Sequence, residues 1–363
     1  MGNTENKDYE ATIMNLRGKQ VLLYGAKYLG DFAYKLLKWY DIMPSGYVVS
    51  DSPTVRILND LPIYSLKELH SMVNDDTVIL LSLNQKYHGE VLAALRSEGL
   101  ENVCLIDLFS NFNFYEYFFR KICSNIFRQH GIDITGEIIK IGKYQQINPY
   151  RHSGMNTFFI EAMDIILPPF FSNYDYVVEG PYEHGAVQLE KDDIVFDCGA
   201  HMGIFSCYAA SKGCTAYAFE PLVEESAGIL EKHAFLHPLI KSYPYALADR
   251  CESMTINVSP VDLASSLVIV DDSFTSATVQ AITIDQFVAD NSIKRVDFIK
   301  ADIEGAERLM LAGATETLRR FAPKLAICTY HHDDDPQVLE QIIKAANPRY
   351  NIVHKWKKLY ANV

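Results

Sequence analysis

The sequence predicts an α/β protein made of two successive units, each built on a mainly parallel, doubly wound sheet. Short apolar runs alternate with stretches of helical periodicity. This alternation occurs twice, over residues 20–108 and again over residues 177–363. Glycines follow several of the runs, where a strand would turn into a helix. Strands that alternate with helices favour a parallel sheet covered by helices, and 363 residues suffice for two such cores.

A small Rossmann-like domain is expected in residues 1–110. Its first strand leads into the loop Gly25-Ala26-Lys27-Tyr28-Leu29-Gly30, and Asp51 follows the second strand. The loop lacks the middle glycine of a dinucleotide fingerprint, which argues against NAD. We expect either a scaffold that forms homo-oligomers or a degenerate site for a nucleotide or sugar. The expected elements are strands at Gln20–Tyr24, Tyr47–Val49, Val78–Leu81 and Val103–Ile106 and a helix at Gly89–Arg96.

Residues 111–176 interrupt this rhythm and are expected to form a helical and irregular connector. They begin with an aromatic-rich helical piece, NFNFYEYFFRKICSNIF, whose aromatic stripe is typical of a core or an interface. A turn-rich stretch follows, with Pro149, Gly154, Pro168 and Pro169. We expect the connector to pack between the two domains.

The second domain is expected in residues 177–363, with an extended elaboration at residues 253–281. Its expected strands are Ile194–Asp197, Ala216–Phe219, Ile240–Tyr245, Val296–Lys300 and Leu325–Thr329, with a terminal pair at Tyr350–Val353 and Lys358–Ala361. Its expected helices are Ile204–Ser211, Glu224–Phe235, Thr283–Asp290, Ala306–Arg319 and Gln337–Ala346.

The composition is that of an ordinary globular protein with a strongly acidic balance. Hydrophobic residues make up 48% of the chain and the formal net charge is −13, which argues against a nucleic-acid partner. No apolar run reaches the roughly 18 residues of a membrane-spanning helix, and the polar N-terminus lacks the apolar core of a signal peptide. The 7 cysteines form no CxxC pair, so we expect reduced thiols and a cytoplasmic location.

The stretch IVFDCGAHMG carries the first candidate site. A buried strand would end at Asp197, and Gly199 and Gly203 would let the backbone approach a ligand before the next helix begins. In open α/β sheets ligands bind at the carboxyl ends of strands, where such loops meet. The next strand ends in Glu220-Pro221, and an acidic residue at this place accepts hydrogen bonds from ribose hydroxyls.

Two features of this loop favour a sulfonium ligand over a dinucleotide. The pattern G-x-x-x-G is a wider turn than G-x-G-x-x-G, and Asp197 would repel a pyrophosphate but attract an ammonium or sulfonium group. They point to S-adenosylmethionine rather than NAD. A purely structural turn is the alternative. An oxidoreductase is disfavoured because neither domain carries a full dinucleotide fingerprint.

The charged run KADIEG at residues 300–305 is the second candidate, directly after an apolar strand. With period two, Lys300, Asp302 and Glu304 would point to one side if the strand continued. Packing explains three such charges poorly, because buried charges are costly unless paired. The alternatives are a structural Lys300–Asp302 ion pair and Glu304 in the first turn of a helix. Glu307 is expected to be a solvated helix residue.

The run YHHDDD at residues 330–335 is the third candidate. Its composition suits a divalent cation or a proton relay. His331 lies nearest the strand end and is expected to reach the same opening as Asp302. Asp302, Glu304 and His331 are therefore the candidate metal ligands, although their spacing leaves the presence of a metal open. Asp335, followed by proline, is expected to be the N-cap of the next helix.

Five motifs in order make the second domain resemble a known family. D-C-G-A-x-x-G, F-E-P, Y-A-L, ITIDQF and F-I-K-A-D-I-E-G-A-E, within roughly residues 177–332, resemble the FkbM family of S-adenosylmethionine-dependent methyltransferases. The resemblance implies a class I methyltransferase fold, with a Rossmann-like seven-stranded sheet whose last strand is antiparallel. It also implies O-methylation of sugar or polyketide hydroxyls. Two departures are His201-Met202, where a small polar residue is usual, and Ala301, where a larger aliphatic is usual.

The resemblance also implies roles for individual residues. S-adenosylmethionine would be bound by Asp197, Gly199, Ala200, His201, Gly203, Glu220, Pro221, Ala246 and Leu247. From the residues themselves, we expect catalysis on a glycan or small-molecule acceptor to involve Lys300, Asp302, Glu304 and His331, with His331 or Glu304 taking the proton from an acceptor hydroxyl. The alternative is an accessory protein that binds a nucleotide or sugar and has a non-catalytic methyltransferase-like fold.

Overall fold

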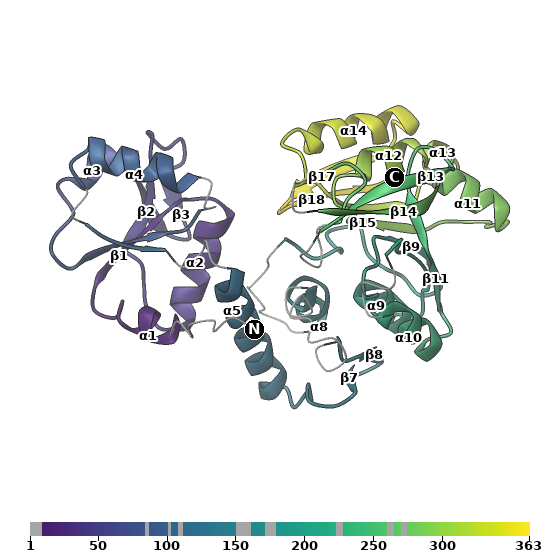
Figure 1. The fold of residues 1–363 in the computed structure, drawn as a ribbon, viewed down its shortest axis with the longest axis horizontal. Coiled ribbons are helices and arrows are strands. Elements are labelled where there is room, and N and C mark those ends of the chain that lie inside the picture. The colour runs from purple at the N-terminus through teal and green to yellow at the C-terminus, as the bar shows by residue number, and fades with distance from the viewer. Residues whose placement is uncertain are drawn as a thin grey trace. The chain divides into compact units, whose positions relative to one another are not determined.

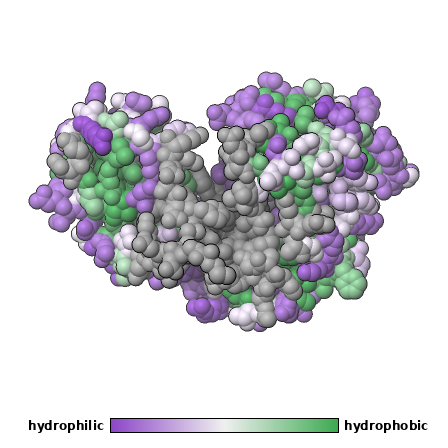
Figure 2. All heavy atoms as spheres, viewed as in Figure 1, coloured by the Kyte–Doolittle hydropathy of each residue, from purple (hydrophilic) through white to green (hydrophobic). Residues whose placement is uncertain are grey.

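The computed structural model describes residues 9–83, 87–100, 103–107, 112–149, 161–170, 179–222, 228–259, 265–269 and 274–363 (Figure 1). The chain divides into two compact units, Met1–Phe119 and Arg120–Val363, with the boundary inside helix α5 (Phe112–Gln129). Figure 2 shows that hydrophilic side chains cover much of the described exterior on the face in view. Within the described ranges, every helix is too short or too polar to cross a membrane.

The first unit contains a six-stranded sheet in the order β3-β4-β2-β1-β5-β6. Strand β1 pairs in parallel with β2 and β5, as the alternation of strands and helices predicted. The β3–β4 hairpin was not predicted, although Asn59 and Asp60 at its turn have φ of 51° and 60°, a conformation these residue types tolerate. The elements are α1 (Tyr9–Met14), β1 (Gln20–Tyr24), α2 (Tyr28–Trp39), β2 (Gly46–Val49), β3 (Ile57–Leu58), β4 (Leu61–Ser65), α3 (Leu66–Leu69), β5 (Thr77–Leu81), α4 (His88–Ser97) and β6 (Cys104–Asp107).

The glycine loop of the first unit, residues 25–30, is closely packed. A Cβ on Gly30 would lie 1.9 Å from the Gly25 carbonyl oxygen, and a Cβ on Gly25 would lie 2.5 Å from the Ser82 carbonyl oxygen. The Ser82 hydroxyl also donates a hydrogen bond of 2.9 Å to the Tyr24 carbonyl. Both glycines are therefore required by the packing of β1, α2 and the end of β5.

The second unit is built on a seven-stranded sheet in the order β11-β10-β9-β15-β16-β18-β17. Six strands run in one direction, whereas β18 runs antiparallel to both of its neighbours, β16 and β17. The antiparallel last strand implied by the family resemblance is thus confirmed. The sheet strands are β9 (Ile194–Cys198), β10 (Thr215–Phe219), β11 (Ile240–Tyr243), β15 (Phe298–Ala301), β16 (Lys324–Cys328), β17 (Asn351–Lys355) and β18 (Lys358–Asn362).

The two faces of this sheet differ in character. One face packs against α11–α14 through a large apolar cluster that includes Phe196, Ile299 and Leu325. Because side chains alternate along a strand, Asp197 and Lys300 point to the opposite face, where their Cα positions are register partners. The helices are α9 (Ile204–Ser211), α10 (Ile229–Leu236), α11 (Ile284–Asp290), α12 (Glu307–Ala312), α13 (Thr315–Phe321) and α14 (Asp335–Ala346).

Two expected elements are each divided in the structure. The expected strand Ile240–Tyr245 is broken at Pro244, so that β12 (Tyr245–Leu247) joins a separate three-stranded sheet with β13 (Ser253–Val258) and β14 (Thr275–Ile282). The expected helix Ala306–Arg319 is broken at Gly313, where a Cβ would lie 2.2 Å from the Ala248 carbonyl oxygen. Gly154 and the start of the expected helix Glu224–Phe235 lie outside the described residues.

The connector contributes β7 (Ile138–Ile141), β8 (Tyr144–Ile147), η2 (Ala162–Ile166) and α8 (Leu167–Phe170). His233 of α10 fastens it to the loop before α9. Its Nδ1 lies 2.7 Å from the Met202 carbonyl, and its Nε2 accepts a hydrogen bond of 2.7 Å from the Ile147 amide. The ring is fully buried, and this burial lowers the pKa of His233 to about 4. His233 is therefore neutral in the folded protein, because Nε2 must accept.

This histidine predicts a loss of stability in mild acid. The folded-state pKa of about 4 lies below the ordinary value of 6.5, so the unfolded chain takes up the proton first as the pH falls. The stabilisation that neutral His233 gives to the folded state is complete above pH 6.5 and is lost between pH 6.5 and 4. When the pH is lowered from 7.5 to 5, we expect the free energy of unfolding of the second unit to fall by about 2 kcal/mol more in the wild type than in His233→Gln, because glutamine does not titrate. Urea unfolding at the two pH values measures this difference, and equal losses would contradict it.

Candidate functional site

A cavity of about 360 Å³ lies in the second unit, at the carboxyl ends of β9, β10 and β15. This is the edge at which open α/β sheets bind their ligands. The expected residues that line it are Gly199, Ala200, His201, Glu220, Pro221, Ala246, Leu247, Lys300, Asp302 and Glu304. Asp197, Gly203 and His331 are not among the lining residues and lie behind the wall.

The loop after β9 brings its backbone against the loop after β15. Gly199 has φ of +74°, and a Cβ on it would lie 1.9 Å from the Asp302 carbonyl oxygen. Gly203 has φ of +82°, and a Cβ there would lie 2.7 Å from Leu230 Cδ1. Gly199 therefore permits the close approach of two loops beneath the cavity, whereas Gly203 serves the packing of α9 against α10.

Glu220 is fixed at the cavity wall by two backbone amides. Its Oε2 accepts a hydrogen bond of 2.9 Å from His201 N, and its Oε1 accepts one of 3.0 Å from Leu222 N. The His201 ring is held by Glu161, with 2.9 Å between Nδ1 and Oε1. The carboxylate of Glu220 is thus oriented by the loop, and its remaining lone pairs are available to a ligand.

Asp197 has a protein partner, the ammonium group of Lys300. The Lys300 Nζ lies 3.1 Å from Asp197 Oδ1, and the Ser206 hydroxyl donates a hydrogen bond of 2.6 Å to Oδ2. Lys300 also donates to the Gly199 carbonyl at 2.5 Å. Burial lowers the pKa of Lys300, but the charges of Asp197 and Asp302 outweigh it and raise the pKa above its usual value. The ion pair that Lys300 makes is therefore with Asp197, on the neighbouring strand.

Asp302 also lines the cavity and is held by two tyrosine hydroxyls. Tyr182 donates a hydrogen bond of 2.8 Å to Oδ2, and Tyr330 donates one of 3.1 Å to Oδ1. Burial raises the pKa of Asp302, but the charges of Lys300, His331 and Lys358 outweigh it, so the pKa is lower than usual. Asp302 is therefore ionised at neutral pH.

Glu304 sits in a left-handed backbone conformation, with φ of 52°. This turn, and not a continued strand, brings its side chain to the cavity beside Asp302. Its Oε2 lies 3.2 Å from His331 Nε2. Burial raises the pKa of Glu304 to about 7, against the opposing effect of its contact with His331.

His331 is enclosed by carboxylates, with only 3% of its side chain exposed. Its Nε2 lies 3.8 Å from Asp302 Oδ1, and its Nδ1 lies 3.3 Å from Glu307 Oε1. Burial lowers the pKa of His331, but the hydrogen bonds and charges of Glu304, Glu307 and Asp302 outweigh it and raise the pKa to about 11. His331 thus holds Glu304 in place and does not itself reach the cavity.

Two expectations for neighbouring acids were wrong. Glu307 is fully buried instead of solvated, because its Oε1 accepts a hydrogen bond of 2.8 Å from Ile303 N and contacts His331. Asp334, and not Asp335, occupies the N-cap position of α14. Asp335 is buried and pairs with Arg308 at 2.7 Å.

The candidate metal ligands lie close together. One donor atom from each of Asp302, Glu304 and His331 lies within 4.8 Å of the others. Ligands on a common divalent ion, each roughly 2.0–2.6 Å from it, have separations of this order. The donor set of two carboxylates and one imidazole also suits a divalent cation. The side chains present thus fit either an ion or a shared proton.

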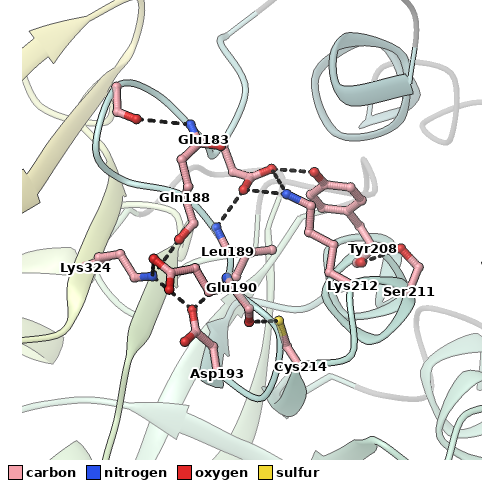
Figure 3. A network of polar contacts seen from close by, with 11 residues as sticks. Glu183, Gln188, Leu189, Glu190, Asp193, Tyr208, Ser211, Lys212, Cys214 and Lys324 are labelled. Carbon is pink, nitrogen blue, oxygen red and sulfur yellow. Dashed lines mark hydrogen bonds and ion pairs between the residues drawn. The ribbon is translucent and has the colours of Figure 1, made fainter.

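Several residues that line the cavity were missed by the sequence analysis: Glu161, Asp164, Glu179, Tyr182 and Lys358. Tyr182 lies in the segment before β9, 120 positions from its partner Asp302. Next to it, Glu183 accepts hydrogen bonds from Leu189 N at 2.6 Å and from Lys212 Nζ at 2.8 Å, which anchors the segment (Figure 3). No local motif marks such a residue, since only the tertiary fold brings it to the site.

Part of the second unit is similar in sequence to known methyltransferases. Residues 197–350 match the family model described as the methyltransferase FkbM domain. The curated hexuronic acid methyltransferase AglP of Haloferax volcanii is 23% identical over 159 residues, which cover 44% of this chain. The match spans 64% of the length of that relative.

Two solved structures are also similar. A methyltransferase FkbM from Methylobacillus flagellatus KT aligns over 98% of this chain and 93% of its own, with 18% identity and a TM-score of 0.41. The fibrillarin pre-rRNA processing protein of Methanococcus jannaschii aligns over 64% of this chain and 84% of its own, with 16% identity and a TM-score of 0.34.

Proposed function

Because residues 197–350 match the family model described as the methyltransferase FkbM domain, we propose that this protein uses S-adenosylmethionine to methylate a hydroxyl oxygen of a sugar or glycan. One observation carries the proposal. A single cavity joins the loop and acid suited to the cofactor, at Gly199 and Glu220, to the acids suited to an acceptor, at Asp302 and Glu304. The similarity to a protein named hexuronic acid methyltransferase supports a sugar acceptor.

The cofactor half of the cavity would be formed by the loops after β9 and β10 and by strand β12. S-adenosylmethionine, when bound, supplies a methyl group on a positively charged sulfur. Glu220, already oriented by two amides, would accept hydrogen bonds from the ribose hydroxyls. Ala246 and Leu247, together with Phe219, provide an apolar wall of the kind that binds a planar base.

The acceptor half would be formed by Asp302 and Glu304. Glu304 lines the cavity and accepts the proton that an acceptor hydroxyl loses, as a general base with a pKa near neutrality does. His331 orients Glu304 through the contact at its Oε2. Asp302 stays ionised and, fixed by Tyr182 and Tyr330, orients a further hydroxyl of the acceptor.

A divalent cation at Asp302, Glu304 and His331 is a second form of the same proposal, supported by the spacing of their donor atoms. Such an ion would supply Lewis-acid chemistry at an acceptor oxygen. His331 would then be neutral, with Nδ1 donating to Glu307, an arrangement in which a buried carboxylate orients a metal-bound imidazole.

The test is incubation of the full chain with methyl-labelled S-adenosylmethionine and a panel of neutral and acidic sugars and cell-envelope glycans. We expect the label in a product that survives mild alkali, as a methyl ether does and a methyl ester does not. Activity that persists after exhaustive chelation supports Glu304 as base, and activity restored by a divalent ion supports the cation. Binding of S-adenosylhomocysteine without any transfer would favour an accessory protein instead.

The cofactor assignment predicts a binding defect in Glu220→Gln. A glutamine presents only one oxygen to the two amides and weakens the charge-assisted hydrogen bonds that a ribose would make. We expect the Kd for S-adenosylhomocysteine, measured by calorimetry, to rise about 10–100-fold. The exposed Glu340→Gln on α14 serves as the matched control and should bind as the wild type does. A change of less than about twofold in Glu220→Gln would refute the assignment.

A further inference from the structure

Two buried lysines, Lys300 and Lys358, point to the same face of the seven-stranded sheet, and of the two only Lys300 has an ion-pair partner among the described residues. Lys300 is the register partner of Asp197 on β9 and of Ala326 on β16. Cys328 lies two residues after Ala326 and is the register partner of Lys358. Because side chains two residues apart on a strand share a face, the two lysines point the same way. Lys300 has an ion pair at 3.1 Å and a carbonyl at 2.5 Å. For Lys358 Nζ, the described part of the chain provides neither a hydrogen bond nor a carboxylate within 4.0 Å. Lys300 is thus paired within the described part of the protein, whereas Lys358 is not.

Lys358 is buried and faces the cavity. Its residue is 1% exposed, and it is one of the cavity's lining residues. Its ammonium lies 4.5 Å from the centre of the Tyr182 ring, and the ammonium of Lys300 lies 5.3 Å from the same centre. A ring contact of this kind compensates only a small part of the cost of burying a charge. A buried ammonium without a close counter-charge, lining a cavity, indicates that an anionic ligand belongs there.

The carboxylates around Lys358 are already committed to other groups. Asp302 accepts the two tyrosine hydroxyls, and Asp164 accepts hydrogen bonds from Glu179 N and Gly180 N at 2.7 and 3.3 Å. The side chain of Glu179 pairs with Lys357 at 3.1 Å. Burial lowers the pKa of Lys358, but the charges of Cys328 and of these three carboxylates outweigh it and raise the pKa above its usual value. The ammonium is therefore charged at neutral pH and does not serve as a base.

The position of Lys358 in the sheet assigns it to the acceptor. It begins β18, which is separated from β9 by β15 and β16. The residues proposed for the cofactor follow β9 and β10 or lie in β12, whereas Asp302 and Glu304 follow β15. Lys358 therefore lies beyond the acceptor acids, on the side away from Gly199 and Glu220.

We propose that Lys358 binds a carboxylate on the acceptor, so that the protein methylates a sugar acid in preference to its neutral counterpart. This inference rests on the proposed methyl transfer. A carboxylate fits better than a phosphate, because one ammonium balances one negative charge. The nearby Asp302, Asp164 and Glu179 would repel a second negative charge. The carboxylate so held is not the atom that is methylated; it orients the ring so that a hydroxyl meets Glu304.

The test compares matched sugars and matched variants of the full chain. Calorimetry in the presence of S-adenosylhomocysteine gives the affinity for methyl glucuronoside, methyl glucoside and glucose 6-phosphate, and labelled transfer gives kcat/KM for the first two. We expect the wild type to prefer the acid by about 10–100-fold, the size of one charge-assisted contact. In Lys358→Met the preference should fall to near parity, with S-adenosylhomocysteine binding unchanged. Lys358→Arg should keep the preference, and the exposed Lys355→Met should match the wild type.

The possible outcomes separate this inference from the proposed function. Transfer to acid and neutral sugars at equal rates would overturn the role of Lys358 while leaving methyl transfer intact. Tighter binding of the sugar phosphate would overturn the choice of a carboxylate. Weaker binding of S-adenosylhomocysteine in Lys358→Met would place the cofactor's own carboxylate at this lysine. Absence of all transfer would overturn the proposed function, and the calorimetric comparison would still decide whether Lys358 binds a sugar acid.

Discussion

Replacing Glu304 by glutamine is expected to lower kcat for methyl transfer about 10²–10⁴-fold, the usual contribution of a positioned general base. The substitution keeps the shape of the side chain but removes the group that takes up the proton. The amide also cannot accept from His331 Nε2, now 3.2 Å from Oε2, as strongly as the carboxylate does. Because Glu304 lies on the acceptor side, the Kd for S-adenosylhomocysteine should stay within about twofold of the wild type.

The comparison needs a control in which an acid is lost elsewhere. Glu316→Gln removes an exposed carboxylate of α13 that pairs with the exposed Arg319, and its kcat should equal that of the wild type. Single-turnover rates with saturating cofactor separate chemistry from product release. A Glu304→Gln protein that retains more than a tenth of the wild-type rate would exclude Glu304 as the base and would direct attention to Asp302.

Local features of the candidate site were predicted well from the sequence. A buried strand, a glycine loop and a helix at residues 194–211 form one continuous local pattern, and β9 and α9 match it closely. The acids at Glu220, Asp302 and Glu304 follow strand ends, and the carboxyl ends of parallel strands meet at one edge of a sheet. Short-range pattern and a single topological rule therefore suffice for these residues.

The partners of these residues could not be predicted in the same way. Asp197 faces Lys300 only because β9 and β15 are adjacent, and a chain of about a hundred residues separates them. The sequence predicts an exposed helix residue at Glu307, because only the tertiary structure shows that His331 contacts it. Lys358 carries no motif at all, since it opens a C-terminal strand whose antiparallel pairing with β16 brings it to the cavity. The pairing of strands far apart in the sequence decides which charged side chains meet, and the periodicity of residues along the chain does not reveal this pairing.

Replacing Lys300 by methionine is expected to destabilise the second unit by about 3–5 kcal/mol, because it leaves the carboxylate of Asp197 buried without a counter-charge. Asp197 is fully buried, and Ser206 would be the remaining donor to it. The Gly199 carbonyl also loses its contact with the ammonium, so the loop beneath the cofactor cavity should loosen. Urea unfolding followed by a signal from the second unit measures the change, and the exposed Lys294→Met is the control.

A double-mutant cycle tells an unpaired charge from lost packing. Asp197→Asn removes the negative charge and leaves Lys300 with the carbonyls of Cys198 and Gly199, at 3.4 and 2.5 Å. If the cost of Lys300→Met comes from the stranded carboxylate, adding Asp197→Asn should recover at least about 1–2 kcal/mol of it. Additive losses in the double variant would mean that the methylene chain of Lys300 matters and its charge does not. The ion pair would then not be what holds the glycine loop in place.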